Sequence, residues 1–245
     1  MLDQDRVTIS LGIATYNGGT YLNETLQSVC AQADAISEII VVDDGSKDDS
    51  VKIICARLQG KPNVKIHVSA VNRGISESYN HILQLAQSEY IIIVDQDDLV
   101  PEGYIEAASR RLSNLSDPVV MACNWTSNER SIRVIGRLLR YLPEWIRIPR
   151  SIPVLGWIGT RSSLIYPVKL ARDIGFESSS FDGFDAVHLD QTRAIVPLWW
   201  NSRYRFFYRV HPRATSAALR EIVKPKGIFY SVEYRLRRLA RRFIR

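Results

Sequence analysis

The residues with the clearest chemical potential are the carboxylates of Asp95-Gln96-Asp97-Asp98, which follow the apolar run Tyr90–Val94. Three carboxylates within four residues repel one another unless a cation neutralises them. Mg²⁺ and Mn²⁺ prefer one or two carboxylates together with phosphate oxygens. An Asp-x-Asp motif at the end of a strand is therefore typical of a metal–diphosphate site, although short acidic motifs also occur on ordinary surface loops.

Two other ways of holding a phosphate are missing from the sequence. No G-x-G-x-x-G follows the first predicted strand, so the dinucleotide-binding fingerprint is absent. No G-x-x-x-x-G-K-[ST] occurs in the chain, so the sequence has no P-loop. These absences favour a diphosphate held by a metal ion over one held by a glycine-rich cradle.

The acidic motif belongs to a predicted series of alternating strands and helices in the first 125 residues. The strands are predicted at Val7–Ala14, Glu38–Val42, Val64–Val68 and Tyr90–Val94. The helices are predicted at 20–32, 48–58, 76–86 and 101–112. Continuously apolar strands that alternate with helices predict an α/β fold, a Rossmann-like and mostly parallel sheet with helices on both faces. Ligands bind at the carboxyl ends of such strands, where this chain carries Thr15–Asn17, Asp43–Ser46, Asn72–Gly74 and Asp95–Asp98.

Beyond residue 125 the pattern is weaker. Residues 126–165 favour a basic amphipathic helix, whose apolar side runs from Ile135 to Trp145, followed by a strand at Ser163–Tyr166. A further strand is predicted at Tyr204–Val210. We therefore divide the chain into three segments, which are 1–125, 126–219 and 220–245.

The net charge of +6 hides a strong asymmetry along the chain. Residues 1–129 carry 9 Lys+Arg against 18 Asp+Glu, whereas residues 220–245 carry 9 against 2. No zinc-finger spacing, basic zipper or aromatic RNA-binding motif accompanies the positive charge, so nucleic acid is not an expected partner. Apolar residues at helical spacing among the arginines of residues 229–245 instead favour a basic amphipathic helix on an anionic membrane surface. A solvated helix packed on the protein is the alternative.

The three cysteines, Cys30, Cys55 and Cys123, are too far apart for a C-x-x-C motif and are odd in number. Buried, reduced thiols are therefore expected. The amino-terminal residues lack the pattern of a signal peptide, and an apolar run such as Tyr90–Val94 is too short to span a bilayer. We expect a cytoplasmic protein.

Four stretches, taken in order, resemble the family 2 inverting glycosyltransferases of the GT-A fold, of the bacterial surface-polysaccharide type. They read IATYNGGTYLNETLQSVCAQ, EIIVVDDGSKDDS, NRGISESYN and YIIIVDQDD. Gly175-Phe176 and YRVHPRATS resemble landmarks of the family's C-terminal half. The resemblance implies a metal-dependent hexosyltransferase that uses Mn²⁺ or Mg²⁺. It would move a sugar from a UDP- or dTDP-sugar donor to a glycan hydroxyl on a lipid-linked acceptor at the inner face of the cell membrane.

The resemblance also assigns roles by position. The residues implied at the nucleotide sugar are Thr15, Tyr16, Asn17, Asp44, Arg73, Gly74 and Asp95. Among them, Asp44 would accept a hydrogen bond from N3–H of uracil or thymine, and Gly74 would allow close backbone approach. Asp97 would bind the metal directly, and His211 would reach the metal or the diphosphate. Segment 1–125 would then bind the nucleotide sugar, and 126–219 would bind the acceptor and supply the catalytic base.

Inversion at an anomeric carbon needs a carboxylate that takes the proton from the acceptor hydroxyl. The family usually places this base in a Glu-Asp pair, which this sequence lacks. Asp185 has the better spacing to the YRVH segment, and Asp190 lies at an apparent helix start; Asp182 is a third candidate. Without the pair, a non-catalytic nucleotide-sugar or glycan-binding accessory protein is an alternative, and a nucleotidyltransferase is another.

Several of these polar residues have structural roles as their alternatives. Asn17 would then form only a turn, Asp43 would cap local backbone, and Asp98 would cap the next helix. Arg209 is a candidate phosphate clamp, with a solvated surface position as the alternative. His188 is expected to be structural.

Overall fold

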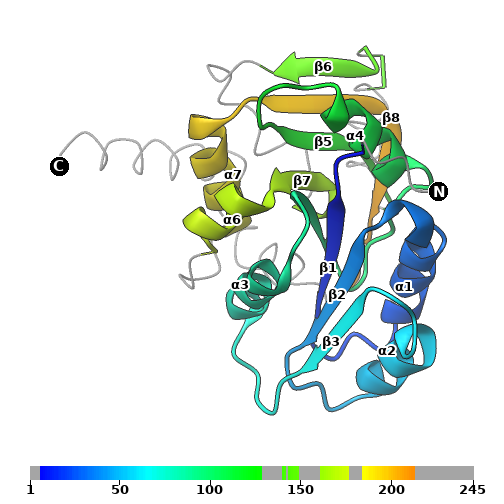
Figure 1. Ribbon diagram of the computed structural model, residues 1–245. Helices are drawn as coiled ribbons and strands as arrows, with labels where there is room; N and C mark the ends of the chain where they lie inside the picture. The colour runs from blue at the N-terminus through cyan, green and yellow to red at the C-terminus, as the bar shows by residue number, and fades with distance from the viewer. Residues whose placement is uncertain (1–5, 129–139, 142, 149–160, 177–183, 213–245) are drawn as a thin grey trace, which may run out of the picture. The chain divides into compact units, whose positions relative to one another are not determined.

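The computed structural model describes residues 6–128, 140–141, 143–148, 161–176 and 184–212 (Figure 1). The chain divides into two compact units, Met1–Arg209 and Val210–Arg245. Every helix and strand among the described residues lies in the first unit. The three-segment division made from the sequence stays a prediction.

The elements of the first unit follow the expected alternation of strand and helix as far as β5. The strands are β1 Ile9–Thr15, β2 Glu38–Asp43, β3 Val64–Val68, β4 Tyr90–Asp95, β5 Val120–Ser127, β6 Trp145–Ile148, β7 Leu164–Pro167 and β8 Leu198–Tyr208. The α-helices are α1 Leu22–Cys30, α2 Ser50–Leu58, α3 Ile75–Leu85, α4 Tyr104–Ser113, α6 Val168–Ile174 and α7 Phe184–Ile195. Two 3-10 turns, η1 Ala33–Ala35 and η3 Arg161–Ser163, complete the described elements.

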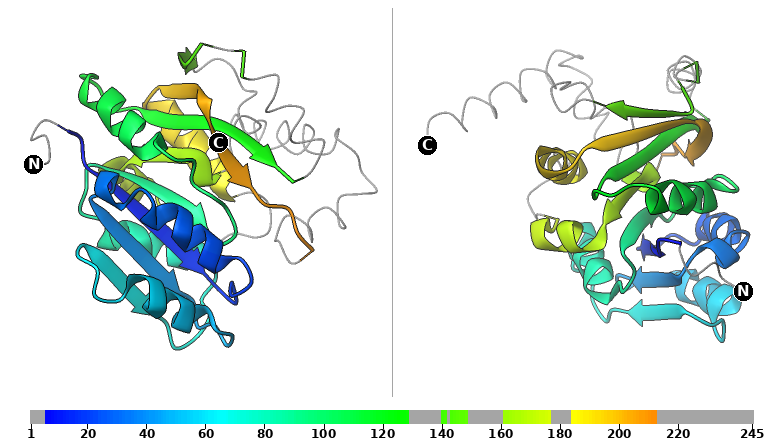
Figure 2. Two further views of the ribbon diagram at one scale, coloured as in Figure 1. Left: turned by 90° about the vertical axis from the view of Figure 1, so that its right-hand side faces the viewer. Right: turned by 45° about the horizontal axis from the view of Figure 1, so that its top comes forward.

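The strands form one sheet of eight, in the order β3-β2-β1-β4-β7-β5-β8-β6. Strands β3, β2, β1 and β4 are parallel, which confirms the predicted parallel sheet. β7 runs antiparallel to both of its neighbours and β6 runs antiparallel to β8, so the second half of the sheet is mixed. Helices α1, α2 and α4 cover one face, and α3, α6 and α7 cover the other (Figure 2).

The core lies between the sheet and these two helical layers. β1 and β2 are buried along their whole length, as their apolar runs predict. A Cβ added to Gly12 of β1 would lie 2.3 Å from Cγ2 of Ile82 on α3. The glycine therefore lets α3 pack closely on the centre of the sheet, and the sheet in turn fixes where each strand end opens.

Three local predictions differ from the structure. The helix expected from Pro101 begins only at Tyr104, because Gly103, with φ +74°, turns the chain before it. Trp145 lies in β6, so the amphipathic helix predicted to end there does not include it; its other members lie largely outside the described residues. The last predicted strand is longer than expected, since β8 starts at Leu198 and shifts register against β5 at Cys123.

The three thiols are not joined by disulfides. Cys123 is buried in β5, and burial raises the pKa of its thiol. Cys30 and Cys55 are half-buried. Among the residues that the structure describes, no helix is long and apolar enough to cross a membrane.

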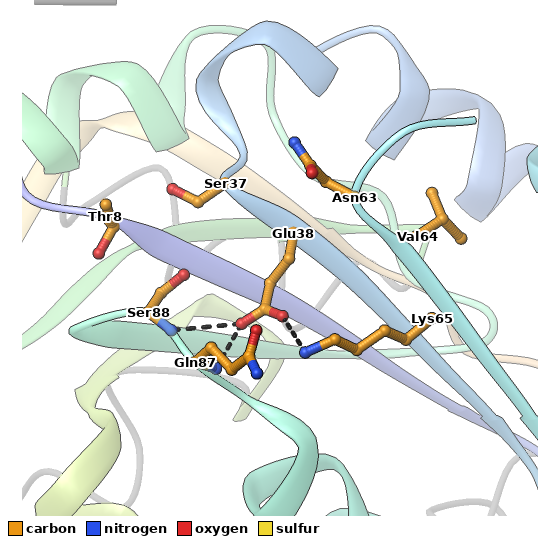
Figure 3. A pocket seen from close by; sticks show the side chains of 8 residues that line it. All are labelled: Thr8, Ser37, Glu38, Asn63, Val64, Lys65, Gln87 and Ser88. Carbon is orange, nitrogen blue, oxygen red and sulfur yellow. Dashed lines mark hydrogen bonds and ion pairs between the residues drawn. The ribbon is translucent and has the colours of Figure 1, made fainter.

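A partly buried ion pair joins the amino-terminal ends of β2 and β3 beside β1, at a small hollow (Figure 3). Glu38 accepts a hydrogen bond from Lys65 Nζ at 2.7 Å and from Ser10 Oγ at 2.6 Å. The backbone N–H groups of Gln87 and Ser88 also donate to it. The hydrogen bonds of the Glu38 carboxylate thus all come from the protein itself, which favours a structural role for the residues at this hollow.

Replacing Glu38 with alanine is expected to lower the free energy of unfolding by about 2–3 kcal/mol at pH 7, because Lys65 and two backbone N–H groups lose a charged acceptor. Urea denaturation measures this loss. The matched control is the exposed Glu102, whose alanine variant should match the wild type to within about 0.5 kcal/mol. Equal stability of the two variants would contradict a structural role for Glu38.

The same carboxylate predicts a pH dependence of stability. Burial alone would raise the pKa of Glu38, but hydrogen bonds from Lys65, Ser10 and Gln87 outweigh burial and lower it below 4.5. A carboxyl with a lowered pKa contributes stability above its unfolded pKa and loses it as the pH falls through the folded value. Wild-type stability should therefore fall on acidification below about pH 4.5, and the Glu38→Ala variant should lose less over that range.

Candidate functional site

The polar residues predicted to gather at one edge of the sheet do so through strand register. Thr15, the last residue of β1, pairs with Asp43 at the end of β2. Ala14 pairs with Asp95, the last residue of β4. The carboxyl ends of three adjacent parallel strands therefore open at the same edge, which is where ligands bind in such sheets.

The carboxylates after β4 have three different environments. Asp95 accepts a hydrogen bond from Tyr79 Oη on α3 at 2.6 Å, and its N–H donates to Ser162 Oγ at 3.1 Å. Asp97 is half-buried. Asp98 is fully buried and accepts a hydrogen bond from the N–H of Arg209 at 3.1 Å. Asp98 therefore does not cap the next helix, which was one structural alternative, but fixes the end of β8 against this loop.

The charge of these carboxylates fits a hard divalent cation. Burial, reinforced by the neighbouring charges of Asp95 and Asp97, raises the pKa of Asp98 well above its usual range. The three carboxyl groups are thus close enough to repel, and a cation bound by Asp97 and Asp95 would offset that repulsion. Within the described residues no group of three or more His, Cys, Asp or Glu side chains forms a complete metal site. Phosphate oxygens of a ligand are the donors that Mg²⁺ or Mn²⁺ would add.

Asp44 and Arg73 are joined through the backbone. The two oxygens of Asp44 accept hydrogen bonds from the N–H of Arg73 at 2.9 Å and of Gly74 at 2.8 Å. Asp44 is buried, whereas the Arg73 side chain is exposed. Gly74 has φ +95°, a conformation that favours glycine, so its role is to turn the chain into α3.

Tyr16 and Asn17 differ in what they offer to a ligand. Tyr16 is 44% exposed, which makes its ring available at the sheet edge. Asn17 has φ +50°, accepts a hydrogen bond from the N–H of Lys47, and donates its own N–H to Ser46 Oγ. Asn17 thus joins the loops after β1 and β2, as the turn interpretation predicts. A contact with the nucleotide stays a proposal.

Close packing between two of these loops depends on Gly45. Its φ is +76°, and a Cβ built there would lie 3.0 Å from the carbonyl carbon of Val71. Gly60, at the end of α2, has nearly the same φ of +77° but nothing within 4 Å of such a Cβ. A side chain at either glycine would meet the strain of a positive φ, but only at Gly45 would it also clash with a neighbouring loop.

Gly45→Ala is expected to cost about 1–3 kcal/mol more stability than Gly60→Ala, because only the first adds a clash to the strain of a positive φ. Thermal and urea unfolding of the two variants measure the difference. Ligand affinity at the sheet edge should fall in the Gly45 variant alone, since Arg73 and Gly74 follow the contacted Val71-Asn72 backbone. An equal cost at both positions would show that the loops do not pack as described.

Two residues that position the site were not assigned that role from the sequence. Gln96, within the acidic motif, reaches back to the end of β1 and bonds Thr15 and Tyr16. Arg209 forms an ion pair with Glu24 at 2.6 Å, donates from Nε to the carbonyl oxygen of Asp97, and stacks over the ring of Tyr21. The side chain of Arg209 is only 15% exposed, so the interpretation as a solvated surface residue is wrong, whereas a phosphate contact stays a prediction.

The two candidate bases lie on one helix. Asp185 and Asp190 both belong to α7, which begins at Phe184, so the interpretation of Asp190 as a helix start is wrong. Their side chains and all of Asp182 lie outside the described residues. His188, on the same helix, is buried and stacks on Phe176 with ring centroids 4.1 Å apart, as expected for a structural histidine. His211 belongs to the second unit, and its role at the metal stays a proposal.

Comparison with known families identifies this arrangement of strands and acidic loops. The model of the family described as "Glycosyl transferase family 2" matches residues 10–175, more than half of the chain. The chain belongs to glycosyl transferase family 2. The matched range of this family 2 chain contains the strand ends of β1, β2 and β4 and all three carboxylates of the acidic motif.

The relatives of this family 2 chain share its fold and part of its length. Glycosyltransferase GlyG of Streptococcus pneumoniae is 33% identical over 121 residues, which are 49% of this chain and 40% of GlyG. S. aureus TarS 1–349, solved in complex with UDP-GlcNAc, superposes with a TM-score of 0.71 at 20% identity, over 86% of this chain and 61% of the 1–349 chain. Mannosyltransferase PcManGT of Pyrobaculum calidifontis, solved with GDP-Man and Mn²⁺, gives 0.64 at 19% identity, over 87% and 60%. The chain thus spans between two fifths and three fifths of the three chains compared, and the two structures confirm the GT-A fold.

Proposed function

We propose that this protein is a metal-dependent, inverting glycosyltransferase. It moves a sugar from a UDP- or dTDP-sugar to a hydroxyl of a glycan in surface-polysaccharide synthesis. Family membership supports the reaction class. The observation that carries the proposal is the meeting of Tyr16, Asp44 and the Asp95–Asp97 loop at one sheet edge. The sequence resemblance supports the choice of nucleotide and of acceptor class.

In the proposed complex, the nucleotide lies across the ends of β1 and β2. The exposed ring of Tyr16 stacks on the base. Asp44 accepts a hydrogen bond from N3–H of the base, because each carboxylate oxygen keeps a second lone pair beyond the one used by the loop at 73–74. Arg73, whose side chain is exposed beside this loop, contributes a positive charge toward the diphosphate. Asp95, held by Tyr79, accepts from the ribose.

The proposed chemistry is a single displacement at the anomeric carbon. One carboxylate of α7, Asp185 or Asp190, takes the proton from the acceptor hydroxyl as its oxygen attacks from the face opposite the nucleotide diphosphate. Asp97, with Asp95 beside it, would hold Mn²⁺ or Mg²⁺, which when bound offsets the negative charge on the departing diphosphate. Tyr79 holds the Asp95 carboxylate by a direct hydrogen bond, and Arg209 holds the main chain of Asp97 through its carbonyl oxygen.

A donor panel tests this function. UDP-, dTDP- and GDP-sugars are incubated with the protein and Mn²⁺, and release of the nucleoside diphosphate is followed with and without glycan acceptors. We expect release from a UDP- or dTDP-sugar that chelation of the metal abolishes. Nucleotide binding without turnover of any donor would instead favour a non-catalytic accessory protein. Pyrophosphate release from a sugar phosphate and a nucleoside triphosphate would favour a nucleotidyltransferase.

We also propose that residues 229–245 hold the enzyme at an anionic membrane surface, where a lipid-linked acceptor is available. Six arginines in this segment, each worth about 1 kcal/mol near such a surface, support the proposal. Sedimentation with vesicles of anionic phospholipid should capture the full chain, and deletion of residues 229–245 should abolish capture. Unchanged capture of the shortened chain would refute the membrane role and leave the transferase proposal untouched.

A further inference from the structure

The side chain of Gln96 connects the acidic loop to the nucleotide loop. Its Oε1 accepts hydrogen bonds from Thr15 Oγ1 at 2.7 Å and from the N–H of Tyr16 at 2.8 Å. Its Nε2 donates to the carbonyl oxygen of Tyr16 at 3.3 Å. One amide group thus satisfies both backbone polar groups of Tyr16, as a neighbouring strand would, and takes the Thr15 hydroxyl as well.

The residues around Gln96 leave space for its side chain and hold its main chain in place. A Cβ on Gly18 would lie 2.4 Å from Gln96 Oε1, so the glycine leaves the space that the amide fills. The backbone of Gln96 is also held, because Thr25 Oγ1 on α1 donates to its carbonyl oxygen at 2.9 Å. Its side chain and its main chain are therefore both fixed from the β1–α1 segment, about 80 residues away in sequence.

We propose that Gln96 is a positioning residue that sets the distance between the base-binding ring of Tyr16 and the carboxylates of Asp95 and Asp97 on either side of itself. The inference rests on the proposed function and adds a role that the Asp-x-Asp motif does not carry. It also changes the expected role of Thr15. This side chain is 2% exposed and its hydroxyl is bonded to Gln96, so Thr15 acts through Gln96 and not by touching the nucleotide.

The physical consequence is preorganisation of the donor site. A nucleotide diphosphate must contact the Tyr16 loop with its base and the carboxylate loop with its phosphates at the same time. If the two loops are already joined, binding does not have to order one against the other, and the affinity is correspondingly higher. Without Gln96 the individual contacts survive, but their spacing is no longer fixed.

Four variants test the inference by calorimetry with UDP in saturating Mn²⁺. Gln96→Leu keeps the size of the side chain and removes all three hydrogen bonds, so UDP should bind roughly tenfold more weakly. Thr15→Val removes one of the same bonds from the other side and should weaken binding less. Gln96→Glu keeps both accepted bonds but sets a carboxylate oxygen, which cannot donate, against the Tyr16 carbonyl, so it should recover only part of the lost affinity. The control Gln84→Leu changes an exposed glutamine of α3 and should bind UDP as the wild type does.

Kinetics and hydrogen exchange separate positioning from a general loss of structure. In Gln96→Leu, we expect KM for the donor to rise by more than kcat falls. In the absence of nucleotide, exchange of the Tyr16 N–H should accelerate at least about tenfold, while exchange in the centre of β1 stays unchanged. Slow exchange at Tyr16 or wild-type UDP affinity in Gln96→Leu would overturn the inference. A wild-type protein that binds no nucleotide diphosphate would instead overturn the proposed function.

Discussion

Replacing Asp97 with asparagine is expected to reduce sugar transfer by about 10²–10³-fold and to leave the fold intact. Asparagine keeps the shape of the side chain but removes the charge that would bind Mn²⁺ or Mg²⁺. Asp97 is half-buried at a loop whose main chain is held by Arg209, so the substitution leaves that support in place. The measurement is kcat/KM for the donor across a range of Mn²⁺ concentrations, together with thermal unfolding.

The matched control for Asp97 is Asp117→Asn, because Asp117 is an exposed aspartate in the loop before β5. This variant should retain wild-type transfer and the wild-type response to Mn²⁺. The variant at Asp97 should also need a higher Mn²⁺ concentration for whatever activity remains. Full activity at the wild-type metal concentration would remove Asp97 from the metal site.

The second large effect concerns the catalytic base. Asp185 and Asp190 are five residues apart on α7, which places their backbone positions about 140° apart around the helix axis. They therefore stand on different faces, and only one of them is expected to serve the reaction. Asparagine at that position should lower kcat by about 10²–10⁴-fold and leave UDP affinity unchanged, because the base acts on the acceptor and not on the donor.

The test measures kcat for sugar transfer in two α7 variants, Asp185→Asn and Asp190→Asn. The control is Asp173→Asn, at an exposed aspartate of α6. The inactive variant should also lose the acidic limb of the pH profile of kcat, which reports protonation of the base. If both α7 variants transfer sugar as fast as the Asp173 variant, the base lies elsewhere in the chain. Loss of UDP affinity together with kcat would point to a structural role for the affected residue.

The first half of the fold could be predicted because its signals are local. The apolar runs that became β1, β2 and β4 are buried on both faces, and the turn residues after them end the strands at the expected positions. The second half depends on pairings that are distant in sequence. Trp145 carries no local sign that β6 will pair with β8, and its spacing from the preceding apolar residues also fitted a helix.

The residues of the candidate site also divide into those with local signals in the sequence and those that depend on distant partners. The carboxylates at the end of β4 could be located because their type and position both point to a cation. Gln96 and Arg209 could not, because their roles depend on partners about 80 and more than 100 residues away along the chain. An arginine beside a polar motif suggests phosphate binding. The charge of Glu24 and the ring of Tyr21, which hold Arg209, come close to it only in the folded chain.

The measurement that tests the account most directly is a crystal structure of the protein soaked with UDP and Mn²⁺. We expect the uracil against Tyr16 and Asp44, the metal between Asp97 and the diphosphate, and one aspartate of α7 facing the open side of the β-phosphate. The metal should disappear from the same experiment with Asp97→Asn. Nucleotide bound at another edge of the sheet, or a diphosphate bound without metal near Asp97, would contradict the proposed donor site.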